Sequence, residues 1–90
     1  MNNELMDKIK SDLNGWVIDS ELLVKEFVFS TFQDAINFVN AVAKIADEVD
    51  HHPYIFISYN KVKISLTTHD VGEITEKDYS LAKAIEFLEV

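Results

Sequence analysis

Residues 50–69 read DHHPYIFISYNKVKISLTTH, and this stretch decides the fold. Pro53 cannot continue a helix and disfavours helical dihedrals in the residue before it, so any preceding helix must end here. Residues 54–59 and 61–67 are rich in β-branched and aromatic side chains and are predicted as two strands. Asn60 between them tolerates the positive φ that tight hairpin turns require. The stretch therefore predicts a helix end followed by a β-hairpin.

The second predicted strand shows which face of the sheet is covered. Its side chains alternate between an apolar and a polar set: Val62, Ile64 and Leu66 against Lys61, Lys63 and Ser65. A period of two places one set on each side of a sheet. We therefore expect an antiparallel sheet with one buried face and one face in water.

A long helix is predicted upstream of the hairpin. Ser30 or Thr31 can cap it, Asp34 suits its first turn, and apolar residues at helical spacing continue to Asp50. The main stripe comprises Phe32, Ala35, Ile36, Val39, Val42, Ala43, Ala46 and Val49, and a narrower second stripe comprises Phe38, Ala41 and Ile45. A helix buried on both sides in its own core is one interpretation. Because a small domain has little material to cover two faces, we favour packing of the second stripe on a neighbouring subunit.

The two ends of the chain complete the pattern. Residues 3–13 form an amphipathic repeat that ends at Asn14-Gly15, and two short strands are predicted at 16–18 and 22–29. A last helix begins near Thr75, which is spaced to form a cap with Asp78. The predicted fold is α+β, a four-stranded antiparallel sheet with three helices packed on one face, in the order α-β-β-α-β-β-α.

Composition limits the classes of function. Ninety residues, 48% of them hydrophobic, predict a single domain over 1–90 that gains stability by self-association. The net charge of −8 and the absence of arginine argue against direct nucleic-acid binding. No apolar run is long enough to span a membrane and no signal peptide is apparent, so we expect a cytoplasmic protein. The absence of cysteine excludes disulfides, thiol nucleophiles and thiolate metal sites.

All three histidines of the chain lie within residues 50–69. His51 and His52 precede the predicted hairpin and His69 follows it. About six residues out and six back, at roughly 3.3 Å each, nearly cancel along the strands, so His69 should lie close to the other two. Imidazole donates and accepts protons near neutral pH, and three such groups together suit acid–base catalysis.

The chain resembles the pterin-4a-carbinolamine dehydratase family, also known as the dimerization cofactor of hepatocyte nuclear factor one. The resemblance runs from Gly15-Trp16 to the last helix. Its most specific residues, at family spacing, are Asp47, Asp50-His51-His52-Pro53, Tyr59-Asn60-Lys61-Val62, Thr68-His69 and Asp78. One departure is Ile55, which stands where the family usually has tryptophan or another large aromatic residue, with Tyr54 before it.

The resemblance implies dehydration of a 4a-hydroxytetrahydropterin, the product of aromatic amino-acid hydroxylases, to the quinonoid dihydropterin. By similarity, His51 and His69 transfer protons around the 4a-hydroxyl, and His52 holds the pterin and shares in the transfer. The carboxylates Asp47 and Asp50 would orient imidazoles, and Asp78 would fix a histidine or contact the pterin. The resemblance further implies a homodimer or homotetramer with no metal and no cofactor, in which the pterin is the substrate.

Several alternatives compete with these roles. Asp78 can serve as a helix cap, Asp47 as a solvated charge, and His51 as a favourable charge near a helix C-terminus. Three histidines could also form a zinc site. A second class of function is a non-catalytic protein-binding module that stabilises a partner's dimerization, as in animal relatives. A third is an enzyme acting on another reduced pterin, within molybdopterin metabolism.

Overall fold

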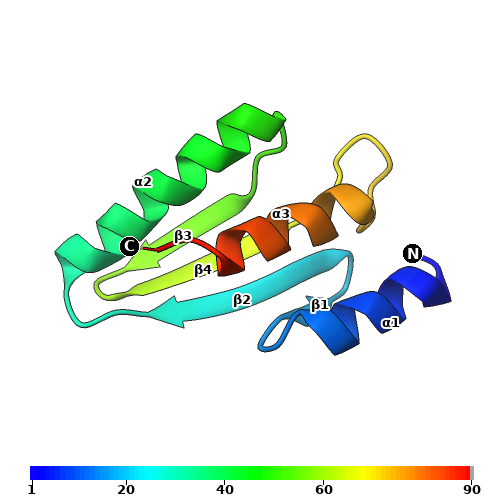
Figure 1. Cartoon of the computed structure of the whole chain (residues 1–90), viewed down its shortest axis with the longest axis horizontal. Helices are drawn as coiled ribbons and strands as arrows, with labels where there is room; N and C mark the ends of the chain where they lie inside the picture. The colour runs from blue at the N-terminus through cyan, green and yellow to red at the C-terminus, as the bar shows by residue number, and fades with distance from the viewer. Residues whose placement is uncertain (90) are drawn as a thin grey trace.

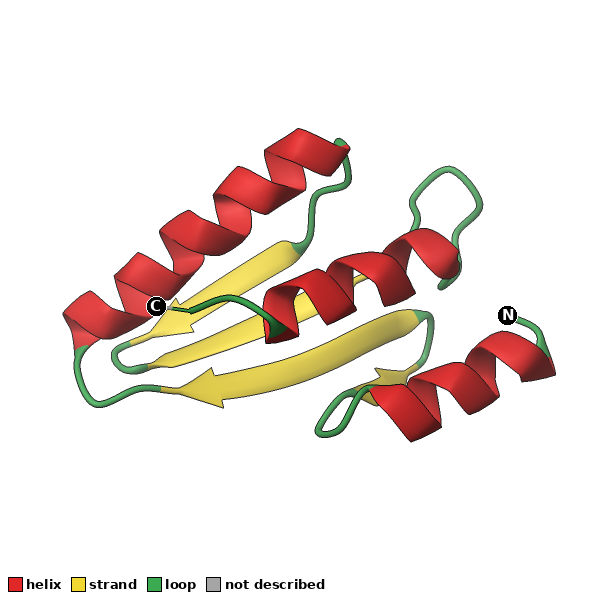
Figure 2. Cartoon of the chain, viewed as in Figure 1, coloured by secondary structure: helices red, strands yellow, loops and turns green. Residues whose placement is uncertain are grey.

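A four-stranded antiparallel sheet carries three helices on one face, in the predicted order α-β-β-α-β-β-α (Figures 1 and 2). The computed structural model describes residues 1–89. Its elements are α1 (Asn3–Asp12), β1 (Val17–Asp19), β2 (Leu22–Val28), α2 (Phe32–Val49), β3 (Tyr54–Ser58), β4 (Lys61–Leu66) and α3 (Glu76–Glu86). Among these described residues, no helix is both long and apolar enough to cross a bilayer.

The strands lie in the order β1-β2-β4-β3, so β4 is central while β1 and β3 form the edges. On β4, Ile64 pairs with Lys25 of β2 and Ile55 of β3. The register places the apolar set of β4 on the side that the helices cover. The sheet and helices share one core, whose completely or almost completely buried side chains include Ile9, Leu23, Val42, Val62, Ile64, Leu66, Ile74 and Ile85.

The helix starts follow the predicted capping residues. The Thr31 hydroxyl accepts the amide of Asp34 at 3.0 Å, and Thr75 forms a capping box with Asp78. Each cap satisfies amides that the first turn leaves without a partner. The beginning of α2 and the beginning of α3 were therefore both predictable from local sequence.

The prediction that the second stripe of α2 faces a neighbouring subunit is wrong at Phe38. This ring is only 3% exposed and packs against the rings of Phe27 and Phe29, at centroid distances of 4.7 and 5.0 Å. The exposed part of α2 instead belongs to the main stripe, where Phe32 is 51% and Val49 is 58% exposed. The sheet covers the line Ala35, Phe38, Val42 and Ala46, which takes members from both stripes.

Two expectations about the hairpin also need correction. The positive φ falls on Tyr59 (φ 53°) and not on Asn60. Asn60 is held by the end of β2, because its side-chain amide donates to the carbonyl of Phe29 and its own carbonyl accepts the Phe29 amide, both at 2.8 Å. Ser65, expected in water, is buried because Val24 and Tyr54 flank it in the register.

A hydrogen bond from the Tyr79 hydroxyl to the Asp12 carboxylate ties α3 to α1. This bond lowers the pKa of Asp12 below its ordinary value and raises the pKa of Tyr79. A depressed carboxyl pKa contributes stability above the unfolded-state value of 3.8, and the contribution is lost as pH falls through the folded-state value. The raised Tyr79 pKa contributes below pH 10.0 and is lost as pH rises through the folded-state value.

We therefore expect Tyr79→Phe to lower the free energy of unfolding most at neutral pH. The difference from wild type should shrink as the pH falls from about 4 through the lowered pKa of Asp12 in the folded wild-type protein, because below that value Asp12 is protonated in both proteins. Urea unfolding across this pH range measures the effect. Tyr59→Phe, which alters a tyrosine that is 68% exposed, is the matched control and should show no such pH-dependent difference.

Candidate functional site

The C-terminus of α2 determines where His51 points. Asp50 ends the helix in the left-handed conformation (φ 53°), and the His51 amide donates back to the carbonyl of Ala46 at 3.1 Å. Pro53 then leads directly into β3. This reversal turns the His51 side chain inward, where it is only 13% exposed.

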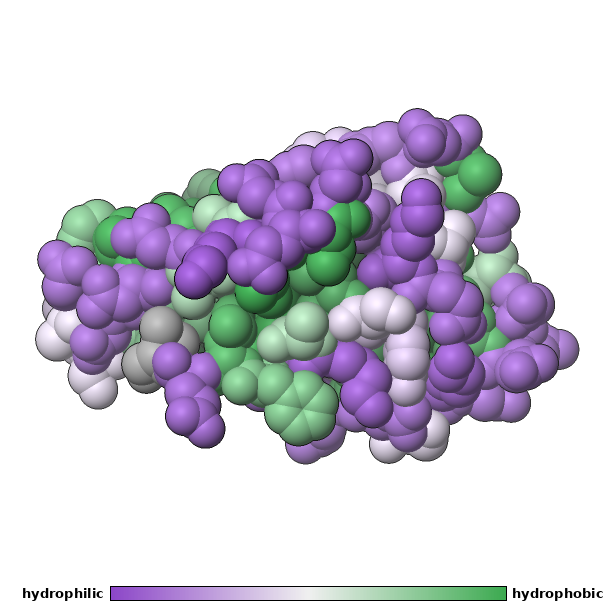
Figure 3. Space-filling view, turned by 45° about the horizontal axis from the view of Figure 1, so that its top comes forward, coloured by the Kyte–Doolittle hydropathy of each residue, from purple (hydrophilic) through white to green (hydrophobic). Residues whose placement is uncertain are grey.

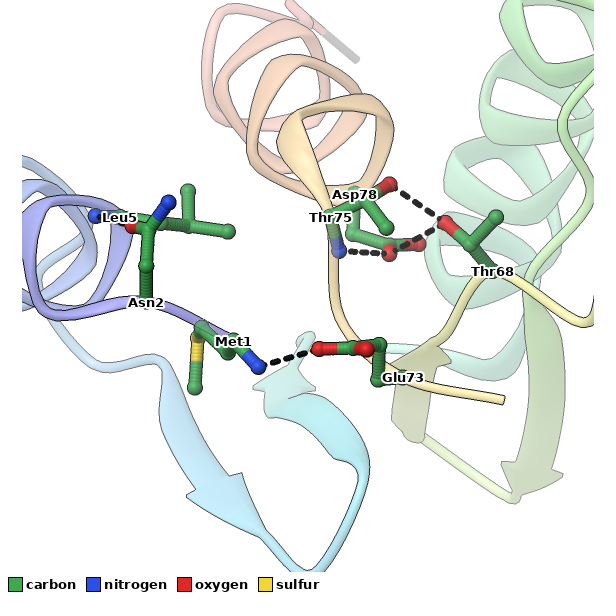
Figure 4. Close-up of polar contacts among 7 residues, drawn as sticks. All are labelled: Met1, Asn2, Leu5, Thr68, Glu73, Thr75 and Asp78. Atoms are coloured by element: carbon green, nitrogen blue, oxygen red, sulfur yellow. Dashed lines mark hydrogen bonds and ion pairs between the residues drawn. The ribbon is translucent and has the colours of Figure 1, made fainter. Parts of the chain in front are cut away.

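The carboxylate of Asp78 is completely buried and connects three segments of the chain. One oxygen, Oδ1, lies 2.6 Å from Nε2 of His51. The other, Oδ2, accepts the Thr68 hydroxyl at 2.8 Å and the Thr75 amide at 2.9 Å, as Figure 4 shows. The Thr68 and Thr75 hydroxyls also lie 2.7 Å apart. Asp78 is thus both a helix cap and the partner of a histidine.

This contact determines which nitrogen of His51 carries the proton when Asp78 is ionised. An ionised carboxylate can only accept hydrogen bonds, so Nε2 carries the proton that is donated to Asp78. In that tautomer Nδ1 holds the lone pair. Because the carboxylate is itself fixed by Thr68 and Thr75, the His51 ring has one defined orientation.

His52 has a more open environment. Its Nε2 lies 2.9 Å from Oδ1 of Asp47, one turn back on α2, and the two side chains are 58% and 77% exposed. The sequence left Asp47 open between a solvated charge and an orienting group; the structure shows a solvated charge in contact with His52. An exposed pair of this kind contributes little to stability.

His69 reaches the same region from the end of β4. Its ring contacts Tyr54 edge to face, with centroids 5.4 Å apart and an angle of 83° between the planes. The following loop is closed by the amides of Val71 and Gly72, which donate to the Thr68 carbonyl. Glu73 in this loop forms an ion pair with the Met1 amino group (Figure 4). The hydrogen bond from this amino group to Glu73 raises the pKa of the amino group.

A pocket of about 220 Å³ brings the three histidines together. It is lined by Asp50, His51, His52, Thr68, His69, Asp70 and Lys77. Asp47 and Asp78 are not on the pocket wall, but each contacts a histidine that is. The closeness of His69 to the other two, expected from the strand lengths, is therefore found in the structure. Within residues 1–89, no group of three His, Asp or Glu side chains is arranged to hold a metal ion.

Two residues of this site were missed by sequence reasoning. Thr68 was noted only as part of a motif, yet its hydroxyl is buried against Asp78. Lys77 was not singled out in the sequence, yet it lines the pocket together with His51 and His69. The position of Lys77 next to Asp78 was the available signal, because the first turn of α3 had already been predicted to carry Asp78.

The chain is similar over most of its length to known proteins. The family model described as pterin 4 alpha carbinolamine dehydratase matches residues 1–88. A protein of Sulfurisphaera tokodaii, provisionally named pterin-4-alpha-carbinolamine dehydratase, is 46% identical over 90% of each chain. One of Prochlorococcus marinus with the same provisional name is 49% identical, over 82% of this chain and 78% of its own.

Solved structures show the same fold. A crystal structure described as a transcriptional coactivator/pterin dehydratase from Brucella melitensis superposes with a TM-score of 0.88 at 32% identity, covering 96% of this chain and 94% of that one. A pterin dehydratase-like protein, identified as a RuBisCO assembly factor of the alpha-carboxysome, has a TM-score of 0.65. At 22% identity and 79% coverage of this chain, the second likeness shows the fold alone.

Proposed function

The chain belongs to the pterin 4 alpha carbinolamine dehydratase family, and from this membership we propose that it eliminates water from a 4a-hydroxytetrahydropterin. The C4a–O bond breaks as a proton is delivered to the departing hydroxyl. A proton leaves N5, whose electrons form the C4a=N5 double bond of the quinonoid dihydropterin. The reaction changes no oxidation state, so proton transfer is the chemistry that the protein must supply.

The observation that carries the proposal is three imidazoles on one pocket, one of them held by a buried carboxylate. We assign His51 and His69 to proton transfer at the 4a-hydroxyl and N5, and His52 to holding the pterin and sharing in the transfer. Asp78 orients His51, Asp47 orients His52, and Asp50 shapes the wall by ending α2. Positioned acid–base groups of this kind typically contribute about 10²–10⁴-fold.

The direct test is the decay of chemically generated 4a-hydroxytetrahydropterin, followed by stopped-flow absorbance. Catalytic amounts of the protein are expected to accelerate dehydration well beyond the spontaneous rate. The same amount of heat-unfolded protein is the control, because it measures any acceleration by histidine side chains that are not held in a folded site. A decay rate that the folded protein leaves unchanged would contradict the assignment.

The cytoplasmic location and the particular pterin used in the cell stay predictions.

We also propose that the protein is a homodimer or homotetramer. Phe32 on α2 and Phe56 on β3 are 51% and 66% exposed, and β3 presents an unpaired edge. Sedimentation velocity is expected to show an oligomer at micromolar concentration, and Phe32→Ser or Phe56→Ser should weaken it. Phe87→Ser, at a phenylalanine that is 79% exposed near the C-terminus, is the control. A stable wild-type monomer would refute the oligomer.

A further inference from the structure

The three histidines of the pocket are held in different ways. A carboxylate oxygen lies 2.6 Å from Nε2 of His51, and another lies 2.9 Å from Nε2 of His52. Within residues 1–89, no carboxylate is paired with His69. Its ring instead contacts the ring of Tyr54, with centroids 5.4 Å apart and the planes at 83°. The third imidazole therefore has an aromatic partner where the other two have an anionic one.

The strand pairing brings Tyr54 to His69 and keeps it off the pocket wall. Tyr54 begins β3, and His69 follows shortly after the end of β4, the strand that pairs with β3. The neighbouring Ile55 pairs with Ile64 on the side of the sheet that the helices cover, so strand alternation puts Tyr54 on the other side. Tyr54 does not line the histidine pocket. Its ring thus contacts a pocket residue without facing a bound molecule.

His69 stands in an open and polar part of the surface. Both His69 and the following Asp70 are exposed. Figure 3 shows mainly hydrophilic residues toward the right-hand end of the molecule, the end at which Figure 1 places the loop after β4. An exposed side chain samples several rotamers, and only some of them present the imidazole to the pocket. An edge-to-face contact between two rings favours the contacting orientation by about two- to tenfold.

We propose that Tyr54 is a positioning residue for His69, and that its ring keeps the imidazole oriented for proton transfer. The inference rests on the proposed function, which assigns His69 to that transfer. Because the contact is made between the rings, it does not need the phenol hydroxyl of Tyr54. Because Tyr54 is off the pocket wall, its effect should fall on kcat and leave KM unchanged.

Three variants separate the ring from the rest of the side chain. Tyr54→Leu removes the ring but keeps apolar bulk, and it is expected to lower kcat for 4a-hydroxytetrahydropterin dehydration about two- to tenfold. Tyr54→Phe keeps the ring and should retain the wild-type kcat. Tyr59→Leu makes the same substitution at a 68% exposed tyrosine at the opposite end of the hairpin, and it should also retain the wild-type kcat. If circular dichroism shows that Tyr54→Leu does not fold, Tyr54→Val, which suits a strand, replaces it.

Two further measurements show whether the effect passes through His69. In a His69→Ala background, Tyr54→Leu is expected to cause no further loss of kcat, because the imidazole that the ring orients is gone. In carbon–proton NMR spectra of the imidazole groups, Tyr54→Leu should move the His69 signals more than those of His51 and His52, and Tyr54→Phe should move them little. These spectra need no turnover, so they test the contact independently of activity.

The outcomes separate this inference from the proposed function. If the wild-type protein accelerates dehydration and Tyr54→Leu has the same kcat, the positioning role is wrong and the dehydratase assignment stands. His69 signals that Tyr54→Leu does not move lead to the same conclusion. So does an equal loss of kcat with and without His69, since Tyr54 would then act through another group. If the wild-type protein does not accelerate dehydration, the proposed function is wrong and the positioning role with it.

Discussion

Replacement of His51 by alanine is expected to lower kcat for dehydration about 10²–10⁴-fold, the usual contribution of one positioned acid–base group. His51 is the most constrained of the three histidines, because its Nε2 is fixed to Asp78 at 2.6 Å and its side chain is 13% exposed. The loss should appear in kcat more than in KM, since the proton transfer belongs to the transition state. Stopped-flow decay of the 4a-hydroxy substrate provides both constants.

Comparison with the other two histidines makes this expectation specific. His69→Ala should show a loss in kcat of the same order, because both residues are assigned to proton transfer. His52→Ala should raise KM at least as much as it lowers kcat, because this exposed residue is assigned mainly to holding the pterin. Circular dichroism checks that each variant folds. A folded His51→Ala protein with wild-type kcat would refute the role of His51.

Replacement of Asp78 by alanine is expected to have the largest effect on stability of any change at the site. It removes the acceptor for the Thr68 hydroxyl, the Thr75 amide and Nε2 of His51, and all three face a fully buried position. A lost cap costs about 1 kcal/mol, and a buried donor left without a partner costs about 1–3 kcal/mol. We expect the free energy of unfolding to fall by about 2–4 kcal/mol, measured by urea denaturation.

Asp78→Asn separates the structural role from the catalytic one. The amide keeps the size of the carboxylate and one acceptor oxygen, so the loss of stability should be smaller, about 1–2 kcal/mol. Its NH₂ group can face His51 and favour the other tautomer, and activity is expected to fall about 10–100-fold. Asp47→Asn, which alters the exposed carboxylate beside His52, is the matched control and should cost less than tenfold in activity with no change in stability. Equal losses in the two variants would argue against a special role for the buried carboxylate.

Local sequence predicted most of the secondary structure. Ser30 or Thr31 was expected to cap α2, where the structure shows Thr31, and Thr75 was recognised as a cap from its spacing to Asp78. Pro53 marked the change from helix to strand. These signals are reliable because a cap or a proline acts within one helical turn. Even the return of His69 to the region of His51 followed from two strands of similar length, since a hairpin brings its ends together.

Residues of the site that depend on distant neighbours were only partly predictable. The family motif indicated that Asp78 would either hold a histidine or contact the pterin, and Thr75 indicated a cap. Only the folded chain shows that the Asp78 carboxylate both caps α3 and contacts His51. These two residues lie 27 positions apart in the sequence. The role of Thr68 in fixing that carboxylate had no local signal at all.

The sequence by itself determined the order of the elements, their capping residues and the collection of the histidines at one end of a hairpin, because each depends on contacts within a few residues. Tertiary structure alone decided that Phe38 faces the core, that Tyr59 takes the left-handed turn position, and that the ring of Tyr54 contacts His69. Each of these three features depends on which distant segments of the chain come to lie beside it. Periodicity identifies the faces of a helix, but the elements that come to lie against it select the face that is covered.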